Sequence, residues 1–283
     1  MRDTDAPKYV LLSFALYSLS EFVWVWRMSF PIEGVFFKLL YKFGSFSLYL
    51  AVAFVLLHSV VTLGKRKTAI FFSLAMMIGF LSELFGTLYG WIFGQYYYSE
   101  SMRSLLGLMA FETPLSWGVI IYICYSLTNL FLSGFGGEKP RITDKFCWYI
   151  GGIVLLSSID GLSAMNLDMI LDLIGVSTGG WIWVNGGPYF GIPISNFIGW
   201  FLVTSVSTFL FRTYESYTKH ETNRINRKIH YTIVGVYSIY LFRHAAIALA
   251  IGHQEYALIG IATMVPFVLI ALLMFLVKSR ERE

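Results

Sequence analysis

The chain has 283 residues, of which 57% are apolar and only 13% are charged. A soluble domain carries about 25% charged residues, so this composition excludes a water-facing globular surface along most of the chain. The net charge of +4 is gathered in short groups of basic residues, which argues against nucleic-acid binding. The composition, with a mean hydropathy of +0.65, therefore predicts an all-α, polytopic membrane bundle that forms one integral-membrane domain over residues 1–283.

Apolar segments long enough to cross a bilayer follow one another along the whole chain, since a span needs about 20 apolar residues. We predict seven or eight transmembrane helices, near residues 9–27, 43–63, 69–91, 114–134, 146–165, 194–212, 230–251 and 256–277. Residues 32–42 predict a short amphipathic segment at the interface. The connection over 166–193 is rich in Gly and Trp, and it predicts a re-entrant or interfacial segment.

Basic residues orient these helices, because Lys and Arg are concentrated in cytoplasmic loops. Groups of them follow the second, fourth, sixth and eighth segments: Lys65, Arg66, Lys67; Lys139, Arg141, Lys145; Arg212, Lys219, Arg224, Arg227, Lys228; and Lys278, Arg280, Arg282. The connections on the other side are poor in basic residues, except the first, with Arg27, Lys38 and Lys42. The pattern predicts a multi-pass protein of the cell membrane with both termini in the cytoplasm.

Several ionisable residues lie inside the predicted spans, where each costs roughly 2.5–3.5 kcal/mol at mid-helix. They are Glu21, Glu83, Asp160, Arg243 and His244. In the predicted orientation they lie from the middle to the outer part of the bilayer, and outer connections add further carboxylates. One polar cavity that opens outward would explain the whole set. For single residues a structural role stays open: an ion pair for Glu21, a counter-ion for Arg243 and simple packing for His244.

Asp168 and Asp172 are spaced i, i+4, so on a helix both carboxylates share one face. Two like charges so close are unfavourable, so one should hold a proton or meet a cation. In a solvated loop the same pair would cost little, and that alternative stays open. Such a pair can hold Mg²⁺ against a diphosphate, but supporting cations are few here and we predict no metal. Cys124 and Cys147 lack metal-ligand spacing and predict buried apolar positions.

Two blocks of sequence resemble the membrane carotenoid hydratases over about residues 80–200. The first contains SELFG at 82–86, FGQYYY at 93–98 and PLSW at 114–117. The second contains DMILD at 168–172, WIW at 181–183, GGPYFGIP at 186–193 and NFIGW at 196–200. The chain departs from the family pattern at Leu173, where Pro is expected, and at Glu112-Thr113, where small apolar residues are usual.

The resemblance implies a hydro-lyase that needs no cofactor and adds water to the terminal isopropylidene double bond of an acyclic C50 or C40 carotenoid. The product would be a tertiary alcohol, as in the final step from bisanhydrobacterioruberin to bacterioruberin. The implied partners are a carotenoid taken from the bilayer and membrane lipid, with no nucleic acid. Association with other membrane enzymes of carotenoid biosynthesis stays open.

Such chemistry requires a protonated carboxyl group and a second group that stabilises a tertiary carbocation. We expect Asp168, Asp172 and Glu83 to be catalytic, with Asp172 or Glu83 as proton donor and Asp168 as base or cation stabiliser. The expected supporting residues are Asn196, Arg243, Asp160 and Glu112. The expected substrate-binding residues are Tyr96, Tyr98, Trp117, Trp181, Trp183, Tyr189 and Trp200. A transporter, a non-enzymatic carotenoid- or lipid-binding protein and a carotenoid cyclase remain alternatives.

Overall fold

The computed structural model describes residues 6–29, 44, 46–134, 146–218 and 227–280. Within these ranges the chain forms a bundle of long helices with one pair of short strands. The helices are α1 (Ala6–Ser29), α3 (Ser47–Leu63), α4 (Lys65–Tyr89), α5 (Thr113–Gly134), α6 (Phe146–Ser177), α7 (Ile194–Ser216), α8 (Arg227–Ala250) and α9 (Gln254–Arg280). The strands are β1 (Tyr96–Tyr98) and β2 (Trp181–Trp183).

Seven of the described helices are long and apolar enough to cross a membrane, and α3 is a shorter apolar helix. Large apolar side chains such as Leu12 and Leu273 point outward from them, as expected of a surface that faces lipid. The prediction of a polytopic helical membrane protein with seven or eight spans is therefore confirmed.

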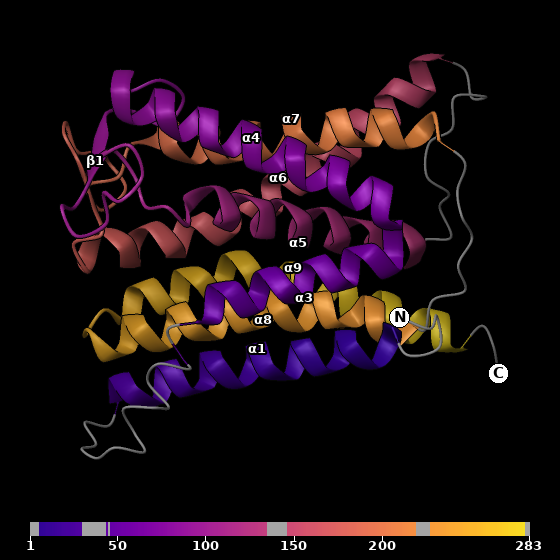
Figure 1. The fold of residues 1–283 in the computed structure, drawn as a ribbon. Helices are drawn as coiled ribbons and strands as arrows, with labels where there is room; N and C mark the ends of the chain where they lie inside the picture. The colour runs from indigo at the N-terminus through magenta and orange to yellow at the C-terminus, as the bar shows by residue number, and fades with distance from the viewer. Residues whose placement is uncertain (1–5, 30–43, 45, 135–145, 219–226, 281–283) are drawn as a thin grey trace.

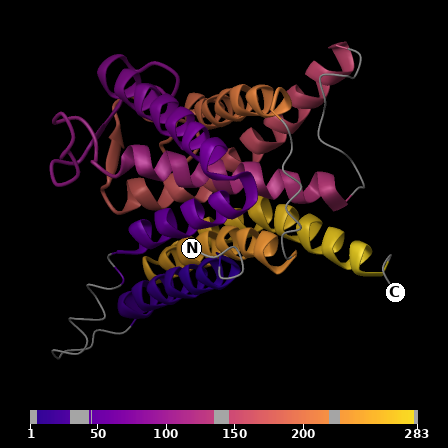
Figure 2. The same ribbon diagram turned by 45° about the vertical axis from the view of Figure 1, so that its right-hand side comes forward.

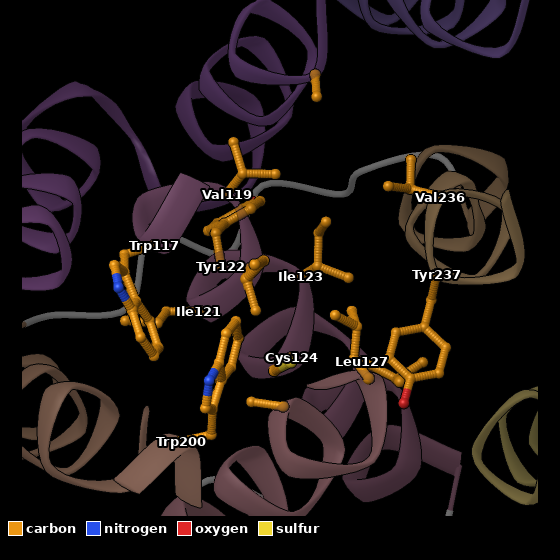
Figure 3. Close-up of a cluster of buried hydrophobic side chains, with 14 of the residues drawn as sticks. Trp117, Val119, Ile121, Tyr122, Ile123, Cys124, Leu127, Trp200, Val236 and Tyr237 are labelled. Atoms are coloured by element: carbon orange, nitrogen blue, oxygen red, sulfur yellow. The ribbon is translucent and has the colours of Figure 1, made fainter. Parts of the chain in front are cut away.

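Helix α5 runs through the middle of the bundle, with α3, α8 and α9 on one side and α4, α6 and α7 on the other (Figures 1 and 2). Its apolar side chains form the centre of the core, where Tyr122, Ile123 and Leu127 are fully buried (Figure 3). At one end of this core the rings of Trp117 and Trp200 lie 4.3 Å apart between centroids. This end of α5 borders the candidate site.

Helices that follow one another along the chain run in opposite directions, so α4 and α6 end where α5 and α7 begin (Figure 1). The β1–β2 pair lies at this end of the bundle, opposite the end at which α1 begins and α9 ends (Figure 1). The strands pair antiparallel, with Tyr97 opposite Ile182 and both exposed. Their neighbours Tyr96, Tyr98 and Trp183 are buried, because successive strand residues face opposite sides.

Helix α6 is longer than the predicted fifth span of 146–165, since it continues to Ser177. Asp168 and Asp172 therefore lie on a helix, and the connection predicted over 166–193 shortens to residues 178–193, which contain β2. The prediction ended the span too early because the polar residues from Asn166 onward lower the local hydropathy. In the structure the helix continues because these carboxyl groups are buried against α7.

Two groups of basic residues differ in position from the prediction. Lys65, Arg66 and Lys67 form the first turn of α4, joined to α3 through Gly64 alone. Arg212 was predicted to follow the sixth span, but α7 continues to Ser216 and buries its side chain. The predicted amphipathic segment at 32–42 lies outside the described residues, as do the basic residues of the connections 135–145 and 219–226.

Candidate functional site

Glu83 lies near the end of α4 and is buried. The Tyr96 and Tyr98 hydroxyls donate hydrogen bonds to its Oε2, the second over 3.0 Å. Trp117 Nε1 donates to Oε1 over 3.0 Å. A Cβ at Gly79, one turn earlier, would lie 2.4 Å from Trp117 Cγ, so this glycine leaves the space that the indole occupies. One carboxyl group thus receives three donors from β1 and α5.

Asp168 and Asp172 lie one turn apart on α6, and a single amide from α7 connects them. Asn196 Nδ2 donates to Oδ2 of Asp168 over 2.7 Å and to Oδ2 of Asp172 over 2.6 Å. The two carboxyl groups therefore share one face of the helix, as their spacing predicts. All three side chains are buried, and Asp168 Oδ1 has no hydrogen-bond partner within the described chain.

A cavity of about 350 Å³ brings the two clusters together, since Glu83, Asp172 and Asn196 all line it. Most of the remaining wall is aromatic or apolar. The other lining residues are Leu48, Phe93, Tyr96, Tyr98, Met102, Ala110, Glu112, Thr113, Ser116, Trp117, Ile120, Leu171, Trp181, Trp183 and Trp200. The largely apolar wall with a few convergent polar groups is typical of a small-molecule site.

The cavity carries acids without basic counter-ions, because no Lys or Arg is among its described lining residues. Burial, reinforced by the nearby Glu83 charge, raises the pKa of Tyr96 and of Tyr98 well above the ordinary tyrosine value. Both phenols therefore stay neutral and keep their hydrogens for the Glu83 carboxylate. The site combines buried carboxyl groups, neutral hydroxyl donors and aromatic faces.

The sequence also matches a known protein family. The sequence model of a family described as "Carotenoid biosynthesis protein" matches residues 43–267, well over half of the chain. The chain belongs to the carotenoid biosynthesis protein family. The match covers both sequence blocks that carry the predicted resemblance, and it supports a role in modifying carotenoids.

One relative of the chain is bisanhydrobacterioruberin hydratase from Haloarcula japonica. It is 30% identical over 130 residues, which are 46% of this chain and 39% of the relative. The match therefore spans well under half of the relative's length. No solved structure matches the chain.

The aromatic residues predicted to bind a carotenoid gather at the cavity with one exception. Tyr96, Tyr98, Trp117, Trp181, Trp183 and Trp200 all line it. The exception is Tyr189, whose hydroxyl donates over 3.0 Å to the carbonyl of Met169, beside the aspartate pair. Burial first, and then the nearby Asp168 and Asp172 charges, raises the pKa of Tyr189 to about 12. Its phenol therefore stays neutral.

Among the expected supporting residues, Asn196 and Glu112 line the cavity, whereas Asp160 and Arg243 lie elsewhere. Glu112 accepts a hydrogen bond over 3.1 Å from the hydroxyl of Tyr49 on α3. Arg243 Nη1 of α8 pairs with Glu21 Oε1 of α1 over 3.0 Å, which fits the predicted counter-ion role but not a place in the cavity.

Asp160 forms a buried ion pair with Arg212. The guanidinium donates from Nε over 3.0 Å and from Nη2 over 2.8 Å to Oδ2, and its Nη1 donates to Asn129 Oδ1 over 2.9 Å. The idea that one cavity collects all the intramembrane acids is therefore wrong for Asp160 and Glu21. Each of these two has its own arginine, because packing brought together helices that the sequence could not pair.

Sequence reasoning missed several residues of the site. Phe93 lines the cavity and belongs to the FGQYYY motif, so the motif itself was a signal for it. Thr113 and Ser116 line the wall at the start of α5, beside the PLSW motif. Tyr49 had no signal, because only packing places it against Glu112. Within the described ranges, no group of three or more His, Cys, Asp or Glu residues is placed to hold a metal ion.

Proposed function

We propose that the protein is a carotenoid hydratase that adds water across the terminal isopropylidene double bond of an acyclic carotenoid, leaving a tertiary alcohol. One observation carries this proposal: among the described residues, buried carboxyl groups lie without a basic counter-ion at an aromatic-lined cavity in a carotenoid biosynthesis protein. The name of the Haloarcula japonica relative supports hydration over other carotenoid chemistry.

Each requirement of the reaction has a candidate group at the cavity. Alkene hydration needs an acid that is protonated at working pH, and burial away from cations favours the neutral form of a carboxyl group. It also needs stabilisation of a tertiary carbocation, which a second carboxylate and the faces of Trp and Tyr supply. The third requirement is one water molecule. Neither an organic cofactor nor a metal enters this mechanism.

The size and place of the cavity suit one end of a long polyene. Ligand pockets measure about 300–1,000 Å³, so a cavity of about 350 Å³ lies at the small end of that range. We propose that only the chain end enters, while the rest of an acyclic C50 or C40 carotenoid stays in lipid. A substrate of the bisanhydrobacterioruberin type fits this arrangement, and the reaction would treat one end at a time.

We further propose that the protein lies in the cell membrane with both termini in the cytoplasm and the cavity near the outer leaflet. Lys65 and Arg66 support this orientation, because both are exposed at the end of α4 that is farther from the cavity. Cysteines introduced at Ser101 and at Lys65 test it in intact cells after Cys147→Ser. A membrane-impermeant thiol reagent should label Ser101→Cys before lysis and Lys65→Cys only afterwards, and the reverse order would contradict the orientation.

Product analysis tests the reaction. The protein is expressed in one host that makes lycopene and in another that makes bisanhydrobacterioruberin. The pigments are separated by chromatography, and their molecular masses are measured by mass spectrometry. Hydration predicts a mass gain of one water for each end that reacts, with a tertiary alcohol at that end. An unchanged mass with a new ring would instead indicate a cyclase. Unchanged pigment in both hosts would favour a binding protein or a transporter.

A further inference from the structure

The two acidic clusters at the cavity differ in how many donors their oxygens receive. Glu83 accepts hydrogen bonds from Tyr96, Tyr98 and Trp117, so both of its oxygens are occupied. An indole N–H can only donate, and both phenols are neutral. A proton on Glu83 would weaken these hydrogen bonds, because a protonated carboxyl group is a poorer acceptor than a carboxylate. The hydrogen-bond geometry thus suits a carboxylate anion.

The aspartate pair receives fewer donors for each carboxyl group. The two groups share the Asn196 amide nitrogen as a donor, Trp181 bonds to Asp172 alone, and Asp168 Oδ1 has no partner among the described residues. Two anions on either side of one amide, both buried, repel each other without compensation. One proton held between the two groups removes this repulsion, and such a pair titrates as a unit.

Only one of the two aspartates reaches the cavity. Asp172 lines it, whereas Asp168 has no exposed surface and is absent from the described cavity wall. Among the described residues, the titratable groups that act on Asp172 are Asp168 on its own helix, Glu83 of α4, Tyr96 and Tyr98 of β1, and Tyr189 after β2. None of these is basic.

We infer that Asp172 delivers the proton, that Asp168 is a positioning residue which keeps this proton on the pair, and that Glu83 is the anion facing the carbocation. This assignment rests on the proposed hydratase function. It narrows the sequence-based hypothesis, in which Glu83 was a second candidate donor and Asp168 a base.

The chemical steps balance within this set. The Asp172 O–H bond breaks as the alkene π pair forms a C–H bond at the less substituted carbon. The neighbouring carbon, which bears two methyl groups, becomes a tertiary cation near Glu83 and the aromatic wall. A water oxygen then forms the C–O bond, and its extra proton returns to Asp172. The sum is alkene plus water to alcohol, with every carboxyl group restored.

Four variants test the assignment in membranes supplied with the acyclic carotenoid, with alcohol formation followed across a range of pH. They are Asp172→Asn, Asp168→Asn, Glu83→Gln and the control Glu100→Gln, whose side chain is 94% exposed in the connection after β1. Elution from a sizing column in detergent confirms that each variant is folded. Asp172→Glu serves as the conservative rescue.

Asp172→Asn should lose at least about 100-fold in rate at the pH values where Asp172 of wild type holds its proton, because the acid is gone. Asp172→Glu should recover part of that loss. Asp168→Asn should remain active. As the pH rises, its rate should begin to fall earlier than that of wild type, because the Asp168 charge no longer keeps the proton on Asp172. Glu83→Gln should be slower at every pH yet keep a loss of rate at high pH. Glu100→Gln should match wild type.

The assignment is overturned if Asp172→Asn keeps activity within about tenfold of wild type. It is equally overturned if Glu83→Gln abolishes the reaction while Asp172→Asn does not, or if Asp168→Asn slows the reaction with an unmoved pH profile. Failure of the hydratase function itself gives a different result, because wild-type membranes would then yield no hydrated product in either pigment host.

Discussion

Two buried acidic clusters lie along the same pair of helices and have opposite electrostatics. Near one end of the bundle, Asp168 and Asp172 of α6 share the amide of Asn196 from α7, and no Lys or Arg is among the described residues of the cavity that Asp172 lines. About two turns earlier on α6, Asp160 meets the guanidinium of Arg212, also from α7. The burial and the helices are the same, and the difference is a cation. An acid that faces a cation is held in a structural ion pair, whereas an acid left without a cation is available for proton transfer.

The two clusters also differ in the free energy that it costs to bury their acids. A buried ion pair contributes little net stability, but loss of one partner leaves a buried charge with nothing to compensate it. An acid that already lacks a cation carries that cost in the native protein, or avoids it by holding a proton. Proteins keep such unfavourable groups mainly at functional sites. The two clusters should therefore respond oppositely to substitution.

The largest expected effect on stability comes from Arg212→Met. This change removes the guanidinium from Asp160 and from Asn129, and breaking a buried pair costs about 3–5 kcal/mol. Thermal unfolding of the purified protein in detergent measures the loss. The double variant Asp160→Leu/Arg212→Met should recover most of it, because no charge remains buried. Equal instability of the single and double variants would contradict the electrostatic explanation.

The sequence predicted the reactive cluster better than the paired one. Asp168 and Asp172 were predicted to share a face because i, i+4 spacing is local, and the aromatic residues followed from the motifs at 93–98 and 181–183. The pairing of Arg212 with Asp160 joins residues 52 positions apart, and only the packing of α6 on α7 produces it. A basic residue at the predicted end of a span resembled a cytoplasmic flank.

For the fold too, features set by the local sequence were predicted, and features set by contacts between distant residues were not. The apolar character and length of each segment predicted the helices, since about 20 apolar residues suffice to cross a bilayer. The end of α6 was missed because hydropathy falls where polar groups begin, although those groups are buried by α7. The antiparallel pairing of β1 with β2 joins residues far apart in the chain, and neither three-residue strand carries a pattern long enough to predict it.

Gly79→Ala should damage the cavity around Glu83 without changing any charge. The added Cβ would lie 2.4 Å from Trp117 Cγ, so the indole must leave its position on Glu83. A displacement of about 1 Å in a site can cost on the order of 100-fold in rate, and overpacking costs about 1–3 kcal/mol in stability. The rate of carotenoid conversion and detergent unfolding measure the two effects.

Gly151→Ala is the matched control for that change. Gly151 also lies in a helix, and an added Cβ there meets nothing within 4 Å. Its activity should equal that of wild type, and its stability should stay the same or rise slightly, because Ala favours helix more than Gly does. If Gly79→Ala behaves like Gly151→Ala, the position of Trp117 is not important for the site.

Tyr98→Phe should have a smaller effect, because Glu83 keeps two of its three donors. A hydrogen bond to a charged group contributes about 1.5–3 kcal/mol, so we expect a loss of roughly tenfold or more in rate. Burial raises the pKa of Tyr98 above its ordinary value, so the hydroxyl stays a donor as the pH rises through about 10. The ratio of wild-type to variant rates should therefore stay constant from about pH 7 to pH 10. A ratio that falls toward one by pH 10 would show that the phenol ionises.

The smallest expected effect is that of Arg243→Gln, which removes the ion pair between α1 and α8. Arg243 makes one contact with Glu21, over 3.0 Å, and its side chain is 28% exposed, against 4% for Arg212. Glu21 is buried and loses its partner, but water and lipid headgroups can reach the exposed arginine side of the pair, so we expect a cost below that of Arg212→Met. Carotenoid conversion should stay within about twofold of wild type, because this pair lies outside the described cavity wall. A large loss of activity in stable Arg243→Gln protein would instead give this arginine the supporting role that the sequence suggested, acting on the cavity through α8.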